Sequence, residues 1–205
     1  LGGTFDPVHY GHLRAAVEVR ERLGLGEVRM LPSANPPHRA EPAASAEHRF
    51  EMLQRATSCQ DFLVPDDCEM RRTGPSWMVD TLSAFREQSP HASLVLIIGQ
   101  DAANGLHRWH RWECLFALAH IAVMRRPGAA SDYHGELQEQ MRKRRVDDPA
   151  SLTRSPAGSV IPVEITQLEI SSTDIREKAE AGRSLLYLTP LPVIEYIRQH
   201  GLYAC

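Results

Sequence analysis

The chain lacks the features that would make it a membrane, secreted or nucleic-acid-binding protein. None of its hydrophobic runs approaches the ~20 residues of a membrane span, and no secretory signal opens it. Its four cysteines are scattered, with no Cys-x-x-Cys pair, which fits free thiols in a reducing cytoplasm better than a disulfide framework or a zinc site. The net charge of −3 argues against a broad basic surface for nucleic acid. We therefore expect a cytoplasmic protein with neither a membrane nor a nucleic acid as partner.

Length and composition are those of a globular protein. At 205 residues, with 42% hydrophobic and 24% charged residues, the chain can bury roughly 70% of its unfolded surface. We expect one domain over residues 1–205, interrupted by a polar excursion at about 129–159. The basic run 142–145 in this excursion is either a phosphate or partner patch or a solvated helix end, and the composition favours the solvated end. Because Leu1 directly precedes a glycine turn that usually follows a strand, we also expect residues upstream of it.

Short apolar runs alternate with helical patterns along the chain. The runs at 28–31, 94–98, 121–124 and 160–165 predict strands, although Pro162 weakens the last. Apolar residues recur at helical spacing from Leu13 to a terminating Gly24, after Met78 and near the C-terminus. The alternation predicts an α/β fold, a Rossmann-like doubly wound parallel sheet with helices on both faces, with ligands at the carboxyl ends of the strands.

The densest motif is the segment 2–12, Gly-Gly-Thr-Phe-Asp-Pro-Val-His-Tyr-Gly-His. It delivers His9 and His12 to the start of a helix, where backbone N–H groups and the helix dipole favour an anion such as a polyphosphate. Two other readings are helix-start packing and a metal pair at His-x-x-His spacing. Metal binding would not require the glycine turn, so the turn favours the phosphate reading.

A second motif, Ile-Ser-Ser-Thr-Asp-Ile-Arg, occupies 170–176. Ser171 and Asp174 have the spacing of a capping box, the ordinary signature of a helix start. Hydroxyl groups at a helix N-terminus, with Arg176 one turn further on, also make a clamp for an anion. The motif therefore predicts a helix start that can also hold phosphate.

A third motif, Asn-Pro-Pro-His-Arg at 35–39, follows the strand expected at 28–31. The two prolines fix an extended loop. At its tip, His38 and Arg39 can add positive charge over a phosphate-rich site, or the loop can be a rigid connector only.

The first two motifs together resemble the signatures of the nucleotidylyltransferase superfamily. The third is narrower and resembles the nicotinate-nucleotide adenylyltransferase branch, as distinct from the phosphopantetheine and glycerol-phosphate relatives. The resemblance covers nearly the whole chain. It implies transfer of AMP from ATP to nicotinate mononucleotide, giving the deamido dinucleotide and pyrophosphate. It also implies Mg²⁺ that accompanies ATP and is held by substrate and water, with no metal site in the protein.

The resemblance assigns residues to the ATP phosphates. It implies that His9 and His12 contact the triphosphate, and that His12 stabilises charge building on the α-phosphate and leaving group. Ser172 and Arg176 would meet the β- and γ-phosphates. The turn itself contributes Gly3, Thr4 and Phe5.

Two further segments carry over to the nucleotide and its acceptor. Gly99 and Asp101 follow the most apolar strand; the glycine permits a ribose to approach and the carboxylate can accept from its hydroxyls, although a plain strand-end turn would look the same. Arg49 is expected to face phosphate, or else to be an ordinary residue of a helix surface.

The nicotinate ring is expected among aromatic residues. Ser76-Trp77-Met78 stands where the family usually has Ser-Tyr-Thr, so backbone N–H groups would still meet the carboxylate while the side-chain contacts change. Trp109 and His110 match the aromatic pair that flanks the pyridine ring, and stacking on Trp109 is worth roughly 1–3 kcal/mol by analogy with base–aromatic stacking.

The expected reaction is in-line attack by the acceptor phosphate, which needs no general base. Three rivals stay open: an enzyme that uses nicotinamide mononucleotide, a nucleotide-binding regulatory module without turnover and, more distantly, a metallohydrolase built on His9 and His12. A homo-oligomer is also left open.

Overall fold

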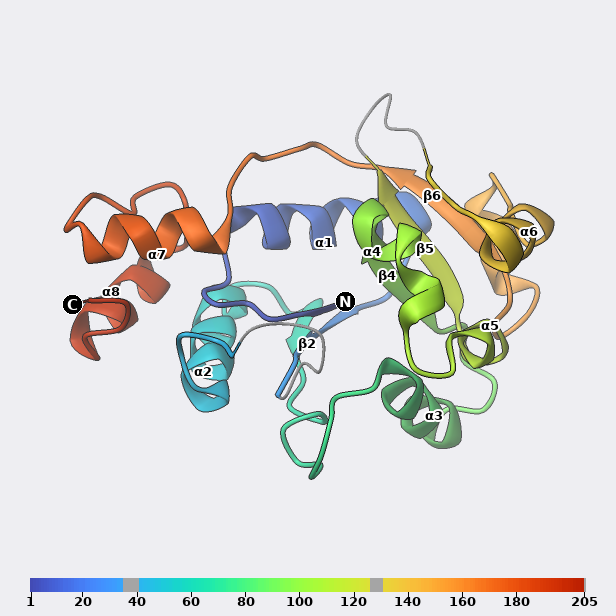
Figure 1. Ribbon diagram of the computed structural model, residues 1–205, viewed down its shortest axis with the longest axis horizontal. Helices are drawn as coiled ribbons and strands as arrows, with labels where there is room; N and C mark the ends of the chain where they lie inside the picture. The colour runs from blue at the N-terminus through green and yellow to red at the C-terminus, as the bar shows by residue number, and fades with distance from the viewer. Residues whose placement is uncertain (35–40, 126–130, 205) are drawn as a thin grey trace. The chain divides into compact units, whose positions relative to one another are not determined.

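The computed structural model describes residues 1–34, 41–125 and 131–204 (Figure 1). The chain divides into two compact units, each formed from more than one stretch of sequence. Unit 1 comprises Leu1–Glu18, Gly26–Ser76 and Thr166–Cys205, and unit 2 comprises Val19–Leu25 and Trp77–Ile165. A single domain over 1–205 therefore stays a prediction.

Unit 1 is built on a three-stranded parallel sheet in the order β1-β2-β3. The strands are β1 (Gly2–Gly3), β2 (Val28–Pro32) and β3 (Leu63–Pro65). Its helices are the first part of α1 (Tyr10–Leu23), α2 (Ala46–Thr57), α7 (Ser172–Glu180) and α8 (Leu191–Gln199). As the sequence predicts, α1 stops at Gly24, whose φ of +64° is the left-handed conformation that suits glycine at a helix end.

Unit 2 holds a second parallel sheet in the order β4-β5-β6. Its strands are β4 (Val95–Gly99), β5 (His120–Arg125) and β6 (Val160–Glu164). Its helices are α3 (Met78–Gln88), the short α4 (Gln100–Asn104) and α5 (Leu115–Leu118), and α6 (Gly135–Lys143). Three short 3₁₀ turns join them: Leu106–Arg108, Trp112–Cys114 and Pro149–Thr153. Pro162 is tolerated because β6 is an edge strand of this sheet.

Parallel strands joined by helices make the fold α/β, as predicted. The apolar run 94–98 became a strand because β4 is buried along its middle, from Leu96 to Ile98. Part of the polar excursion is also ordered, since α6 buries Leu137 and Met141 in the core of unit 2. Among the described residues, no helix has the length and apolar character needed to cross a membrane.

Candidate active site

The turn between β1 and α1 is shaped by contacts that permit little side-chain volume. A Cβ on Gly3 would lie 2.9 Å from the Phe5 ring, so a larger residue there would displace that ring. Phe5 itself has a φ of 50°, a left-handed conformation that is uncommon for a non-glycine residue. The Asp6–Pro7 peptide bond is cis. The close approach of the Phe5 ring therefore explains the glycine at position 3.

The two histidines of the turn form a stacked pair. Their ring centroids are 3.7 Å apart with an interplanar angle of 26°. The backbone N–H of His9 donates to Nδ1 of His12 at 3.3 Å, so a neutral His12 carries its proton on Nε2. The Phe5 ring meets the His12 ring edge-on at 5.0 Å. The pair therefore fixes both the tautomer and the orientation of His12.

Gly11 explains the glycine of the His-x-Gly-His motif. A Cβ at this position would lie 3.0 Å from both Cε1 and Nδ1 of the His9 ring. That is closer than side-chain carbons normally approach, so the His9 ring lies where only glycine leaves room. The glycine is needed for packing of the histidine pair.

His9 is only 6% exposed, and burial lowers the pKa of its imidazole to about 4. At neutral pH the ring is uncharged. Its Nδ1 is buried and has no hydrogen-bond partner among the residues that the structure describes, which is unusual for a buried polar atom. A buried, unsatisfied ring nitrogen beside an oriented histidine is a feature expected of a binding site.

The structure brings the second motif to the first. Ser171 caps α7 by accepting the N–H of Asp174 at 3.1 Å, as its spacing predicts. Ser172 Oγ donates to the carbonyl oxygen of Pro7 at 3.0 Å, and Arg176 Nη1 donates to that of Asp6 at 2.8 Å. Residues about 165 positions apart in the chain thus meet at one turn.

Asp6 is a central residue of this site to which the sequence analysis assigns no role. Its carboxylate is 4% exposed and accepts the backbone N–H groups of Ala43 and Ala44 at 2.8 and 3.2 Å. It also accepts the hydroxyl of Tyr203 at 2.7 Å. Burial and the Asp6 carboxylate raise the pKa of Tyr203 well above its usual range, so the phenol remains a donor. Asp6 therefore ties the turn to the chain before α2 and to the C-terminal tail.

Arg49 contacts the turn through a buried guanidinium group. Its side chain is buried, with the residue 1% exposed, and it donates to the carbonyls of Thr4 at 2.7 Å and Ala44 at 3.2 Å. Burial lowers the pKa of its guanidinium, and the nearby Asp6 carboxylate opposes that shift. The reading of Arg49 as an ordinary helix-surface residue is wrong, because α2 turns it inward. Its contact with phosphate stays a prediction.

The predicted acceptor residues come together within unit 2. The Trp77 and His110 rings lie 4.9 Å apart at 31°. Trp77, Met78 and Trp109 are partly buried and pack against the hydrophobic core of the unit. Two segments separated by α3 and β4 therefore form one aromatic surface.

The turn after β4 is open at the positions predicted to meet ribose. Gly99 precedes α4, and a Cβ built on it would meet nothing within 4 Å. Asp101 is exposed in the first turn of α4. The remaining predicted substrate residues, His38 and Arg39, lie outside the described residues.

Within the described ranges, no three His, Cys, Asp or Glu side chains lie together in a way that could hold a metal ion. The donors gathered around the turn are imidazole, guanidinium, hydroxyl and backbone N–H groups, which suit an anion.

Comparison with known proteins agrees with this geometry. The cytidylyltransferase-like family model matches residues 1–178, and the chain belongs to that family of nucleotidyltransferases. A probable nicotinate-nucleotide adenylyltransferase of Methylococcus capsulatus is 48% identical over 99% of this chain and 97% of its own length. One of Pseudomonas syringae pv. tomato is 45% identical over 99% of this chain and 91% of its own length.

Within the family, the chain belongs to the nicotinate-nucleotide adenylyltransferases, which act in NAD biosynthesis. Its fold resembles that of the Plasmodium falciparum nicotinic acid mononucleotide adenylyltransferase solved with NaAD, at a TM-score of 0.73. That match covers 98% of this chain and 94% of the other at 17% sequence identity.

Proposed function

We propose that the enzyme transfers AMP by direct in-line attack of the phosphate of nicotinate mononucleotide on the α-phosphorus of ATP. A new P–O bond forms to the acceptor oxygen, the bond between the α-phosphorus and the bridging oxygen breaks, and pyrophosphate leaves with that electron pair. The acceptor is already an anion, so the step needs no general base and no covalent enzyme intermediate. Positioning and charge stabilisation carry such a transfer.

The observation that carries this proposal is the meeting of the two motifs at the turn 6–12. Held by its hydrogen bond to the His9 N–H, His12 presents Nε2–H as a donor for charge that builds on the α-phosphate. His9 supplies a buried, neutral imidazole, while Gly3, Thr4 and Phe5 shape the turn. Ser172 and Arg176 hold the β- and γ-phosphates from α7.

The acceptor is recognised by the aromatic surface of unit 2. Trp109 stacks on the pyridine ring with His110 beside it, and backbone N–H groups near Trp77 and Met78 meet the nicotinate carboxylate. Gly99 and Asp101 take the ribose. Arg49, His38 and Arg39 complete the positive charge over the phosphates.

Mg²⁺ neutralises part of the phosphate charge when ATP binds. The donors present fit an ion that is held by the substrate and water, since the turn offers no cluster of carboxylates.

The free thiols of Cys59, Cys68 and Cys114 fit a reducing cytoplasm.

The test is pyrophosphate release from Mg-ATP with nicotinate mononucleotide and, in parallel, with its amide. A strong preference for the acid supports the proposed acceptor pocket. Preference for the amide would keep the phosphate chemistry but refute the reading of Trp77 and Trp109. ATP binding without turnover on either acceptor would favour the regulatory module.

Changing His12 to Ala tests the catalytic assignment directly. We expect kcat to fall by ~10²–10⁴, the usual contribution of a positioned proton donor, with ATP still bound. The matched control is His91→Ala, because His91 is exposed and belongs to unit 2 and to none of the predicted motifs. Near-normal turnover in the His12 variant would exclude this role.

A further inference from the structure

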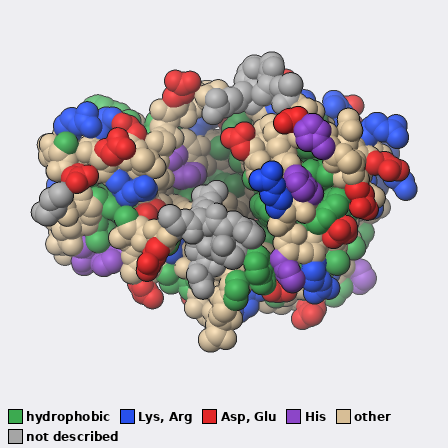
Figure 2. Space-filling model, viewed as in Figure 1, with side chains coloured by type: hydrophobic (Ala, Val, Ile, Leu, Met, Phe, Trp, Pro, Cys, Tyr) green, Lys and Arg blue, Asp and Glu red, His purple; other side chains and the backbone are tan. Residues whose placement is uncertain are grey.

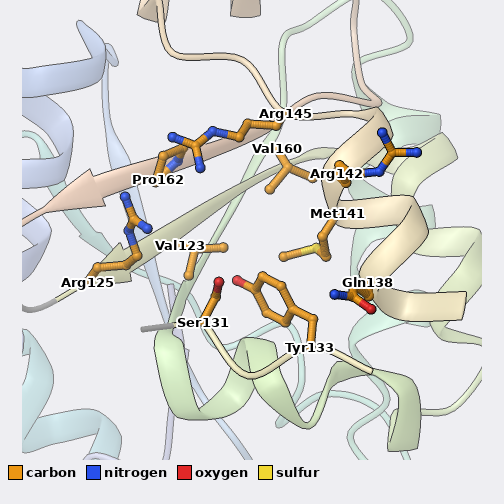
Figure 3. Close-up of a pocket in the computed structure, with 10 residues that line it drawn as sticks. All are labelled: Val123, Arg125, Ser131, Tyr133, Gln138, Met141, Arg142, Arg145, Val160 and Pro162. Atoms are coloured by element: carbon orange, nitrogen blue, oxygen red, sulfur yellow. The ribbon is translucent and has the colours of Figure 1, made fainter. Parts of the chain in front are cut away.

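Unit 2 contains a cavity of about 260 Å³ that none of the predicted substrate residues lines. It lies between α6 and one face of the β5–β6 pair (Figure 3). Val123 on β5 and its register partner Pro162 on β6 contribute to the wall, as does Val160 at the start of β6. The cavity thus extends over the face of the sheet as far as Arg125, the last residue of β5, and neither Gly99 nor Asp101 is among the described residues that line it.

The charged residues among those that line this cavity are all basic. Three of the described residues that line it are arginines, Arg125, Arg142 and Arg145, and none of these lining residues is acidic. Figure 3 shows the guanidinium groups of Arg125 and Arg145 on the side of Pro162, while that of Arg142 points away from them. Figure 2 shows basic and acidic side chains interspersed on the face of the molecule that it presents. An all-basic lining is therefore a departure from the general surface.

Arg125 and Arg145 are available to a ligand. Within the part of the chain that the structure describes, the Arg125 side chain makes no ion pair. Arg145 pairs with Asp147 at 2.9 Å, with side-chain exposures of 52% and 75%. Such an exposed pair contributes at most about 1 kcal/mol and exchanges easily for a better anion.

Hydroxyl groups converge on the same space. Ser131 and Tyr133 line the cavity. Burial raises the pKa of the Tyr133 hydroxyl, and both arginines lie close enough to oppose part of that shift. Guanidinium forks combined with hydroxyl donors suit the tetrahedral oxygens of a phosphate. Val123, Val160 and Met141 provide an apolar surface for the rest of a ligand.

We propose that this cavity is a second anion site, which binds a phosphate-bearing ligand on Arg125 and Arg145. The site is also connected to the turn after β4, at which the ribose is proposed to bind. The side-chain amide of Gln100, which stands between Gly99 and Asp101, donates to the Tyr133 hydroxyl at 3.1 Å and to Asn104 at 2.8 Å. A ligand that shifts Tyr133 therefore acts on the turn after β4, so the site is a regulatory one. This second step rests on the proposed role of Gly99 and Asp101.

Binding is tested by calorimetric titration of the full chain with inorganic phosphate and, separately, with AMP. The test variant is the double change Arg125→Gln and Arg145→Gln. The charge-matched control is Lys143→Gln with Arg154→Gln, two exposed residues of the same unit that do not line the cavity. We expect the test variant to lose one class of site or to weaken it at least tenfold, and the control to behave as the wild type.

The single change Arg145→Gln, at an exposed position, serves if the double variant folds poorly, and it should weaken binding to a smaller extent. Tighter binding of AMP than of phosphate would identify an organic phosphate as the ligand, and equal binding an inorganic one. Titrations of the test and wild-type proteins that coincide for both probes would overturn the proposal.

The connection to the turn is tested by amide hydrogen exchange over residues 99–105 with and without phosphate. We expect at least a twofold change in the wild type and none in Tyr133→Phe, which removes only the hydroxyl. If phosphate binds through Arg125 and Arg145 but leaves amide exchange over residues 99–105 of the wild type unchanged, the regulatory step is refuted. Neither measurement depends on turnover, so failure here is separate from failure of the proposed reaction.

Discussion

The glycines between β1 and the first turn of α1 act by leaving room for neighbouring aromatic rings. Gly11 sits in the first turn of α1, where alanine would normally be preferred by about 0.5–1 kcal/mol. Here a Cβ would press on the His9 ring at 3.0 Å. We expect Gly11→Ala to disturb the stacked histidine pair and to lower kcat roughly tenfold or more, in a protein that still folds.

The matched control is Gly26→Ala. A Cβ on Gly26 meets nothing within 4 Å, so this change should leave steady-state rates unaltered. If Gly11→Ala also keeps the wild-type kcat, the ring positions in the pair do not govern the reaction.

Burial of His9 makes stability depend on pH. Its pKa is about 4 in the folded chain and about 6.5 when unfolded, so between these values the unfolded state binds more protons. The free energy of unfolding therefore falls as the pH drops through this window, and His9 accounts for about 2 kcal/mol of that loss between pH 7 and 4.5. Urea unfolding at both pH values measures it.

His9→Asn should lose about that much less stability between the two pH values than the wild type. His91→Asn, at an exposed position, should lose as much as the wild type does. Equal losses in all three proteins would mean that His9 is protonated without cost in the folded state.

At the scale of elements, the turn between β4 and α4 leaves open space around its glycine. A Cβ at Gly99 touches nothing, so Gly99→Ala should change the free energy of unfolding by no more than about 0.5 kcal/mol. If a ribose approaches this turn, the same methyl group should raise KM for ATP roughly tenfold, because overpacking of this kind costs about 1–3 kcal/mol.

Gly105→Ala is the control at the other end of α4, since a Cβ there makes ordinary contacts of 3.7 and 3.8 Å. It should leave KM for ATP unchanged. An unchanged KM in Gly99→Ala as well would remove the nucleotide role of the turn.

The elements also show why the sequence predicts some parts of the fold and not others. β4 was predictable because its continuous apolar run reflects burial. β3 was missed because it consists of only three residues, Leu63–Pro65, too few for any periodicity to register. β1 contains only Gly2 and Gly3, which have no side chains to form a pattern.

The candidate site divides in the same way. The histidines and the Ser-Ser-Thr-Asp-Ile-Arg segment could be named as candidate site residues from the sequence, because each motif is local and consists of a few adjacent residues. The bond from Tyr203 to Asp6 spans 197 residues, and nothing in either local sequence indicates the other. The burial of Arg49 was not predictable for a related reason, since an arginine on a helix gives no sign that its partners are the carbonyls of Thr4 and Ala44.

Across the whole molecule, the predicted binding roles are divided between the two units. Unit 1 holds the motifs for the triphosphate, at the turn 6–12 and at α7, whereas unit 2 holds the aromatic surface and the turn after β4. The proposed roles therefore predict that substitutions in the two units change different kinetic constants. A change in the phosphate motifs should act mainly on kcat, and a change in the aromatic surface on the KM of one substrate.

Trp109→Ala tests that division. Removing a stacking platform worth roughly 1–3 kcal/mol should raise KM for nicotinate mononucleotide roughly tenfold or more, with a much smaller effect on KM for ATP. Because Trp109 also packs against the core of unit 2, Trp109→Phe is the matched control. It keeps an aromatic face and should recover most of the acceptor affinity. Equal increases in both KM values for the Ala variant, together with a lowered melting temperature, would show that Trp109 supports the fold and does not bind the acceptor.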